Sequence, residues 1–362
     1  MRMRPVLALV LLALALQCRR PAECNALDFS CSPLGMLAFA SPWMAVATGT
    51  NCMGWYSIDR RTWQPFAFPG CTSGTISSIA YGGGTFVAVG STDGTTCGIW
   101  TSTGVYTPAF QQRSCGPTTV RMSAVGFGSG TAGSEFVAAG VPSGANFNAV
   151  SSTDGGITWT DALISEAGSA GAVVSVVYSD TAQLFIESSG TPQNTRTRAI
   201  AGGTNWADGD NMGVTNPKLA PGPLVNGSRR FLGFGNSPSV VQYSDDAFAT
   251  SPTNYSPNIF STGAPVANDM AYGEGQRFVF VRDSCGVTTS ATDSGADASG
   301  AYTMTACSVS NLKAAAYIAP YFVAAGDDGF FYYSTTGLRT EWTRSAVTTA
   351  GTPQKIAGRP GF

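Results

Sequence analysis

One short sequence unit recurs seven times along this chain of 362 residues, and this repeat limits the possible folds more than any other feature. In its clearest form the unit holds a strand that starts with an aromatic residue and ends in glycine, as in Phe86-Val87-Ala88-Val89-Gly90. The chain must build one structural unit about every 47 residues. The aromatic residues that mark the copies lie 43 to 50 residues apart, at Trp43, Phe86, Phe136, Phe185, Phe231, Phe278 and Phe322.

Each copy has the pattern of four short strands. One strand precedes the marker, as in Ile79-Ala80-Tyr81, another follows it, as in Ile99-Trp100-Thr101-Ser102, and a turn leads to the fourth. This length is typical of one blade of a β-propeller, where neighbouring blades cover the faces that a single sheet leaves open. A pair of β-sandwiches is the alternative, but it would not explain a sevenfold repeat. We predict an all-β fold, a seven-bladed β-propeller of four-stranded antiparallel blades, forming one domain over residues 35–362.

The tail of the chain resembles the first strand of a further unit. Residues 355–362 contain Ile356-Ala357, which matches Ile79-Ala80 ahead of the marker Phe86. Pairing with the first blade would remove a free sheet edge and close the ring, whereas the alternative is the stub of an eighth blade. We expect the tail to close the ring.

The first residues have the pattern of a secretory signal peptide. Arg2 and Arg4 precede an apolar run over residues 6–16, which is too short to span a bilayer. The run ends at Ala15-Leu16-Gln17-Cys18, which resembles a bacterial lipobox, although Gln17 replaces the usual small residue. We expect a signal peptide at 1–17, a lipid on Cys18 and a tether at 18–34. Ordinary cleavage with loss of Cys18 is the alternative.

Nine cysteines agree with export from the cytoplasm. Cys18 is the odd one, and the other eight fall into neighbouring pairs. Two strands of one hairpin can bring such pairs close enough to bridge, and disulfides persist in oxidising compartments. We therefore expect an outer-membrane or cell-surface lipoprotein, or alternatively a periplasmic or secreted protein. The expected disulfides are Cys24–Cys31, Cys52–Cys71, Cys97–Cys115 and Cys285–Cys307.

Composition excludes several kinds of chemistry. The chain has no histidine, so a Ser–His–Asp triad, an imidazole base and a histidine-ligated zinc are impossible. Its net charge of −2 gives no electrostatic signal for nucleic acid. The segment 208–213 shares only part of a calcium-loop pattern, and we interpret it as a polar turn. We expect no cofactor and no metal.

One turn carries a known motif. Residues 152–159 read Ser-Thr-Asp-Gly-Gly-Ile-Thr-Trp, which resembles the Asp box, or BNR repeat, of sialidases and related propellers. The resemblance implies a structural turn in which Ser152 and Asp154 accept backbone hydrogen bonds, Gly156 allows positive φ and Trp159 anchors the turn. Decayed copies stand at the same phase of other units, and the resemblance covers roughly residues 36–350.

The catalytic pattern of the sialidases is not recognisable. That family uses an arginine triad, a Tyr–Glu pair, an acidic Asp and an Arg-Ile-Pro motif on six blades, and no Arg-Ile-Pro occurs here. Among the six glutamates, Glu135 and Glu274 sit in turns before a marker, where we expect solvated charges, and Glu187 follows a strand. The expected function is binding or scaffolding of a protein, peptide or glycan by a monomer, with the membrane reached only through the N-terminal lipid. The alternative is a glycoside hydrolase with carboxylates at the central channel.

Overall fold

The structure is a computed structural model, and all its described strands belong to one unit, residues 44–362. The signal segment, the tether, Cys18, Cys24 and Cys31 lie outside the described part. Among the described residues we find no helix with the length and hydropathy needed to cross a membrane. The described ranges are 45–103, 108–143, 146–162, 164–165, 172–190, 194–212, 217–235, 241–254, 267–273, 277–290, 298–307, 310–345 and 351–359.

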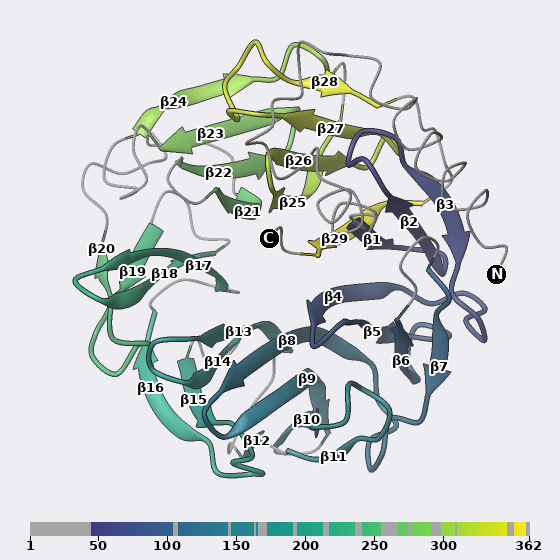
Figure 1. Ribbon diagram of the computed structural model, residues 1–362, viewed down its shortest axis with the longest axis vertical. Coiled ribbons are helices and arrows are strands. Elements are labelled where there is room, and N and C mark those ends of the chain that lie inside the picture. Colours follow the sequence, from purple (N-terminus) through teal and green to yellow (C-terminus); the bar gives the residue numbers. More distant parts are fainter. Residues whose placement is uncertain are drawn as a thin grey trace, which may run out of the picture. The chain divides into compact units, whose positions relative to one another are not determined.

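Seven antiparallel sheets stand in a ring, which confirms the predicted seven-bladed β-propeller (Figure 1). Within each blade the strands follow one another outward from the centre. The first blades comprise β29 (Pro353–Gly358), β1 (Ala45–Gly49), β2 (Met53–Ser57) and β3 (Gln64–Ala67); β4 (Ile76–Gly82), β5 (Thr85–Ser91), β6 (Cys97–Ser102) and β7 (Gln111–Arg113); and β8 (Met122–Gly130), β9 (Gly133–Ser143), β10 (Asn146–Ser152) and β11 (Thr160–Asp161), with β12 (Ile164–Ser165) also paired to β10.

The remaining four blades repeat the same order of strands. They comprise β13 (Val173–Ser179), β14 (Leu184–Ser189), β15 (Asn194–Ala199) and β16 (Ala207–Asn211); β17 (Lys218–Val225), β18 (Ser228–Phe234), β19 (Val241–Ser244) and β20 (Thr253–Asn254); β21 (Ala267–Gly273), β22 (Arg277–Arg282), β23 (Gly286–Ser290) and β24 (Ala298–Thr303); and β25 (Leu312–Ile318), β26 (Tyr321–Gly326), β27 (Phe331–Ser334) and β28 (Thr343–Arg344).

The C-terminal strand closes the ring, as its sequence suggested. β29 pairs antiparallel with β1, with Ala45 opposite Gly358 and Ala47 opposite Ile356 (Figure 1). This register places Ala45 where Phe86 stands in blade 2, because Phe86 lies opposite Tyr81 at the end of its own innermost strand. The marker position of blade 1 is therefore occupied by Ala45, and Trp43 lies outside the described residues.

Aromatic side chains and glycines interlock neighbouring blades. Tyr81 and Phe127 occupy equivalent positions in the innermost strands of blades 2 and 3, and each is followed by a glycine. A Cβ atom added at Gly82 would collide with the ring of Phe127, and one at Gly128 would collide with Tyr178 of blade 4. The missing Cβ thus lets the aromatic ring of the next blade approach the backbone, which explains the recurring aromatic-glycine pair in the sequence.

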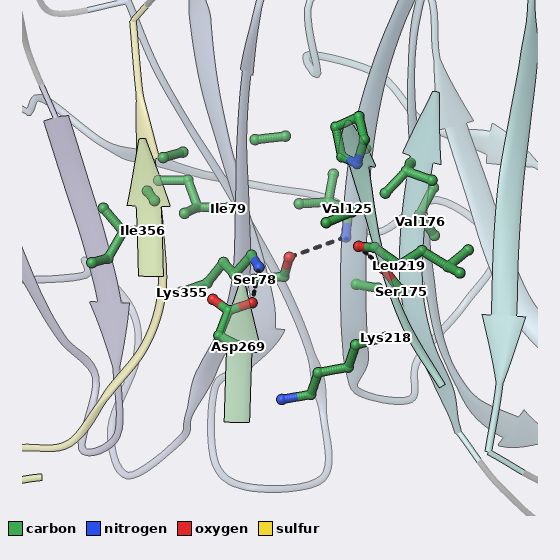
Figure 2. Close-up of a pocket in the computed structure, with 18 of the residues that line it drawn as sticks. Ser78, Ile79, Val125, Ser175, Val176, Lys218, Leu219, Asp269, Lys355 and Ile356 are labelled. Atoms are coloured by element: carbon green, nitrogen blue, oxygen red, sulfur yellow. Dashed lines mark hydrogen bonds and ion pairs between the residues drawn. The ribbon is translucent and has the colours of Figure 1, made fainter. Parts of the chain in front are cut away.

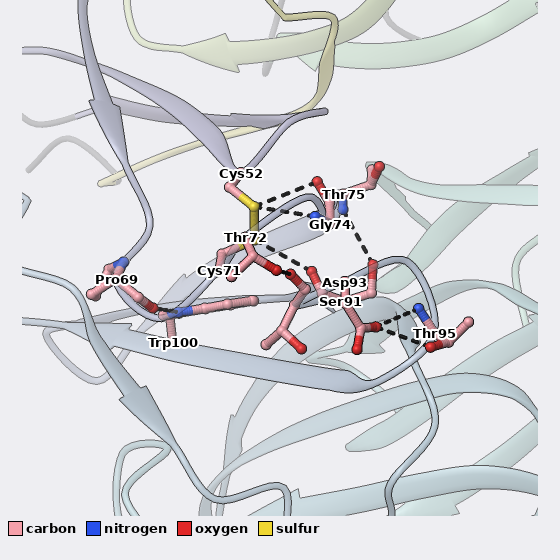
Figure 3. Close-up of a disulfide and its surroundings, with 11 residues drawn as sticks. Cys52, Pro69, Cys71, Thr72, Gly74, Thr75, Ser91, Asp93, Thr95 and Trp100 are labelled. Atoms are coloured by element: carbon pink, nitrogen blue, oxygen red, sulfur yellow. Dashed lines mark hydrogen bonds between the residues drawn. A yellow bond between two sulfur atoms is a disulfide. The ribbon is translucent and has the colours of Figure 1, made fainter.

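Three disulfides lie at one place in their blades. Each joins the link between the second and third strands, or in blade 2 the first residue of the third strand, to the connection that leaves the fourth strand, as Figure 3 shows for Cys52 and Cys71. Closing a loop of this length stabilises a fold by about 3 kcal/mol. Such bonds indicate an oxidising compartment. The three pairs are those expected from the spacing: Cys52–Cys71, Cys97–Cys115 and Cys285–Cys307.

Two sequence interpretations are wrong. Residues 207–211 form β16, the outermost strand of blade 4, rather than a polar turn, because they pair with β15. Glu135 is not a solvated charge: it is 2% exposed and forms an ion pair with Arg198 of the next blade, with 3.0 Å between Oε1 and Nη2. Glu274 lies outside the described residues.

Candidate functional site

A cavity of about 1100 Å³ runs along the axis of the ring. Its wall consists mainly of the innermost strands of all seven blades, β29, β4, β8, β13, β17, β21 and β25 (Figure 2). Each of these strands is the innermost of its blade and pairs antiparallel with the next strand outward. They run in the same direction along the axis. Equivalent positions of the repeat therefore form layers around the channel.

The layers differ in chemistry. Near the start of each strand one register position holds Ser78, Ala124, Ser175, Lys218, Asp269, Ala314 and Lys355. The register position three residues further along is mostly aromatic and holds Tyr81, Phe127, Tyr178, Pro221, Tyr272, Tyr317 and Gly358. The channel thus has a polar end, where the strands start, and an aromatic end.

The polar end is charged along only part of its circumference. Lys355 of blade 1 reaches Asp269 of blade 6, with 2.7 Å between Nζ and Oδ1 (Figure 2). The ammonium of Lys218 donates to the carbonyl oxygen of Asn268. Lys313 pairs with Asp283 at 2.9 Å. Blades 5, 6, 7 and 1 supply these side chains, whereas blades 2 to 4 supply serine and alanine at the equivalent layer.

The charges of this cluster influence one another. Burial lowers the pKa of Lys218 and so do Lys355 and Lys313, while Asp269 opposes the shift. An ammonium in this position therefore carries its charge at a cost in free energy. A nearby anion would reduce that cost.

Small polar side chains of the same layer link neighbouring blades. Ser78 Oγ accepts from the backbone N–H of Val125 at 3.3 Å, and Asp269 Oδ2 accepts from that of Ala315 at 3.0 Å. Ser175 Oγ donates to the carbonyl oxygen of the next blade's Leu219 at 3.3 Å. These bonds connect one blade to the innermost strand of its neighbour, so part of the polar layer is structural.

The aromatic end carries its own ion pair. Arg229 of blade 5 makes two bonds to Asp180 of blade 4, Nε–Oδ1 at 3.0 Å and Nη2–Oδ2 at 2.6 Å. The bond from Arg229 lowers the pKa of Asp180, although burial opposes the shift. The ring of Tyr178 packs on Phe185 with 5.1 Å between centroids. Polar and aromatic groups therefore meet at this opening.

The Asp-box residues do not line the channel. In blade 3 Asp154 accepts from the backbone N–H groups of Ile157 and Thr158 at 3.0 and 2.9 Å, and Gly156 N–H donates to Ser152 Oγ at 2.9 Å. Burial raises the pKa of Asp154, but hydrogen bonds from Thr158, Ser152 and Ile157 prevail and lower it to about 2. Trp159 is buried and donates to the carbonyl oxygen of Gly156 at 2.9 Å. The motif thus forms a local turn.

Variants of this turn hold other blades. In blade 1 the carboxylate of Asp59 accepts from Thr62 N–H at 2.7 Å, although the segment is one residue shorter. In blade 5 Phe248 N–H donates to Ser244 Oγ at 2.7 Å, as Gly156 does to Ser152. The hydrogen bonds of the turn are therefore kept in blades whose sequence matches only part of the Asp-box motif.

The glutamates considered as catalytic candidates are engaged elsewhere. Glu187 is buried in β14 and pairs with Arg196 at 2.6 Å, and Glu135 pairs with Arg198. Asp180 and Asp269 are the only carboxylates among the described residues that line the channel. Asp180 lies five positions beyond the register of Asp269, roughly 16 Å along the axis at about 3.3 Å per residue. Glycosidase carboxylates stand only about 5–9.5 Å apart.

Sequence reasoning missed the lysines at the polar end of the ring. The chain contains only Lys218, Lys313 and Lys355, and each lies at or near the start of an innermost strand. This shared phase within the repeat was the signal that could have identified them. In the described ranges no group of three or more Cys, Asp or Glu side chains could hold a metal ion.

Comparison with known proteins shows the fold alone. No known protein family matches the chain, and no curated protein matches its sequence. A protein assigned as a 6-phosphogluconolactonase from Bacteroides uniformis has a TM-score of 0.64 and 15% identity, with 88% of this chain and 100% of that one covered. YCF48, solved bound to D1 peptide, has a TM-score of 0.57 and 14% identity, with 84% and 86% covered. The WD40 propeller domain of Doa1 has a TM-score of 0.54 and 10% identity, with 85% and 89% covered.

Proposed function

We propose that this chain is an exported, lipid-anchored propeller of the Asp-box type that binds a peptide or glycan in its central channel. The observation that carries the proposal is the channel itself, a cavity of about 1100 Å³. It offers two kinds of contact: the charged arc, which is the part of the polar end formed by blades 5, 6, 7 and 1, and the aromatic opening. Ligand pockets commonly measure about 300–1,000 Å³, so this cavity could enclose several residues or sugar units.

Three further observations support the proposal. The disulfides favour an oxidising compartment, which agrees with a signal peptide at 1–17 and a lipid on Cys18. The turn at Ser152–Trp159 has the hydrogen bonds that an Asp box needs. YCF48, a propeller of similar fold, was solved with a bound peptide.

The test is a binding screen with the protein purified from the membrane of the cells that export it. Peptide and glycan arrays are probed with the native protein and with Tyr272→Ala, which removes an aromatic side chain at the channel opening. We expect one ligand class to bind the native protein and to lose at least tenfold in affinity with the variant, since aromatic contacts dominate many interfaces. Equal binding by both proteins would contradict a site in the channel.

The same preparation tests the alternative activity and the anchor. A panel of fluorogenic glycosides should show no turnover that depends on Asp269 or Asp180, and loss of turnover in Asp269→Asn would instead favour the glycoside hydrolase. For the anchor, mass spectrometry of the mature N-terminus should find an acylated Cys18, and Cys18→Ser should release the protein from the membrane fraction. A free N-terminus beyond residue 18 would contradict the lipid.

A further inference from the structure

Lys218 and Lys355 line the polar end of the channel, and Lys313 lies near the start of β25, next to the lining residues of that strand. The chain has 20 basic residues, of which only Lys218, Lys313 and Lys355 are lysines. They come from β17, β25 and β29, in three different blades and far apart in sequence. The fold alone does not require this gathering, because blades 2 to 4 use serine or alanine in the equivalent layer.

The neighbouring acidic groups do not neutralise the cluster. Asp269 and Asp283 are its carboxylate partners, so three positive charges face two negative ones. Both oxygens of Asp269 are occupied, Oδ1 by Lys355 and Oδ2 by the backbone of Ala315. Among these residues one positive charge is therefore left unbalanced.

The ammonium groups have hydrogen bonds to spare. A protonated lysine offers three N–H donors, and within the described ranges each of these lysines uses one. Lys218 donates to the carbonyl oxygen of Asn268, Lys313 to Asp283 and Lys355 to Asp269. Because Lys218 is partly buried and repelled by the other two lysines, an anion would stabilise its charged form.

We propose that Lys218, Lys313 and Lys355 bind one carboxylate group of the ligand that enters the channel. A single carboxylate balances the excess charge of the cluster, whereas a phosphate dianion would exceed it. The ligand is thereby an acidic one, such as a peptide with a free carboxylate or a glycan with an acidic sugar. The inference rests on the proposed function, because it names the group that the channel recognises.

The small number of lysines makes a direct test possible. Incorporation of lysine labelled with 13C at Cε gives signals from three side chains and leaves the N–H donors of their ammonium groups intact. The labelled full-length protein is titrated with acetate, inorganic phosphate or chloride at constant ionic strength. We expect acetate to shift the signals of all three lysines along one saturable curve, with chloride producing no saturable shift.

Variants assign the binding to the cluster. Lys218→Met should weaken acetate binding at least tenfold, and Lys313→Met should weaken it as well. Arg121→Met is the matched control, since Arg121 is an exposed cation directly before β8, and it should bind acetate as the native protein does. Thermal unfolding verifies that each variant is folded. If Lys218→Met does not fold, the binding measurement on Lys313→Met tests the inference.

Three results would overturn the inference: no saturable shift with acetate, equal weakening in Arg121→Met, or tighter binding of phosphate than of acetate. These results differ from failure of the proposed function. If the arrays return a neutral ligand whose affinity is unchanged in Lys218→Met, the channel binds a ligand but the carboxylate site is wrong. If acetate binds as expected but no array ligand depends on the channel, the lysine site stands and the proposed recognition of a peptide or glycan fails.

Discussion

The two arcs of the channel wall share one backbone and differ in charge. In blades 2 to 4 the polar layer holds Ser78, Ala124 and Ser175, whereas in blades 5, 6 and 1 it holds Lys218, Asp269 and Lys355. Blade 7 has Ala314 in this layer and places Lys313 one residue earlier. The neutral arc, formed by blades 2 to 4, shows which side chains the ring requires in this layer. The charged arc carries charged side chains in addition.

The shared part of both arcs is a bond between neighbouring blades. Ser78 and Asp269 each accept one from the backbone of the next blade's innermost strand. A hydroxyl group suffices for this purpose, as Ser78 demonstrates. The bond between blades therefore requires neither the lysines nor the second oxygen of Asp269. We assign the lysines to ligand binding, and Asp269 Oδ1 holds Lys355.

The largest expected effect is in the charged arc. Asp269→Ala should destabilise the protein by about 3 kcal/mol, because it leaves Lys355 without its carboxylate and the N–H of Ala315 without its acceptor. Urea unfolding measures the loss. Asp269→Ser is the matched variant, and it should recover part of the loss by accepting a bond as Ser78 does. If Asp269→Ala costs no more than Ser78→Ala, the charges add nothing to stability and the comparison fails.

The equivalent change in the neutral arc should be smaller. Ser78→Ala removes the acceptor of Val125 N–H and should cost about 1 kcal/mol, the usual value for one hydrogen bond. The same urea series measures it, with Ser175→Ala as a second site in this arc. Acetate binding should remain unchanged in Ser78→Ala, and a loss of binding would show that the neutral arc also contributes to the ligand site.

Lys218 should be a residue that reduces stability. Its pKa is lowered by burial and by its two neighbours, so the folded chain holds the proton less tightly than the unfolded chain. Lys218→Met should therefore raise the free energy of unfolding at pH 7 by up to about 1 kcal/mol. Stability of the native protein rises with pH from the lowered pKa towards 10.5, so the advantage of the variant should shrink there. An advantage that does not change with pH would contradict this explanation.

The smallest expected effect lies outside both arcs. Ala201 is exposed and has a φ of 57°, a conformation that favours glycine. Ala201→Gly should stabilise the protein by about 0.5 kcal/mol, measured by urea unfolding. It should leave acetate binding unchanged, since Ala201 does not line the channel. A changed affinity would mean that the site depends on stability in general rather than on the charged arc.

The sequence predicted the ring because the ring is periodic. Phe86 and its equivalents recur in blades 2 to 7, and the pairs of cysteines reflect one local geometry. The channel charges could not be placed in the same way, because Asp269 and Lys355 meet only when blades 6 and 1 come together. Glu135 likewise has a solvent-facing sequence context, but Arg198 in the next blade gives it a buried partner. Such contacts join residues of different blades, so the repeat pattern of the sequence does not reveal them.

The pairing of β29 with β1 has a consequence for biosynthesis. Blade 1 is made from strands at both ends of the domain, about 300 residues apart, so it cannot be completed until residues 353–358 have left the ribosome. Until then β1 presents an unpaired inner edge. A prematurely terminated chain keeps that edge and is exposed to proteases and aggregation. Closure of the ring therefore depends on the synthesis of β29.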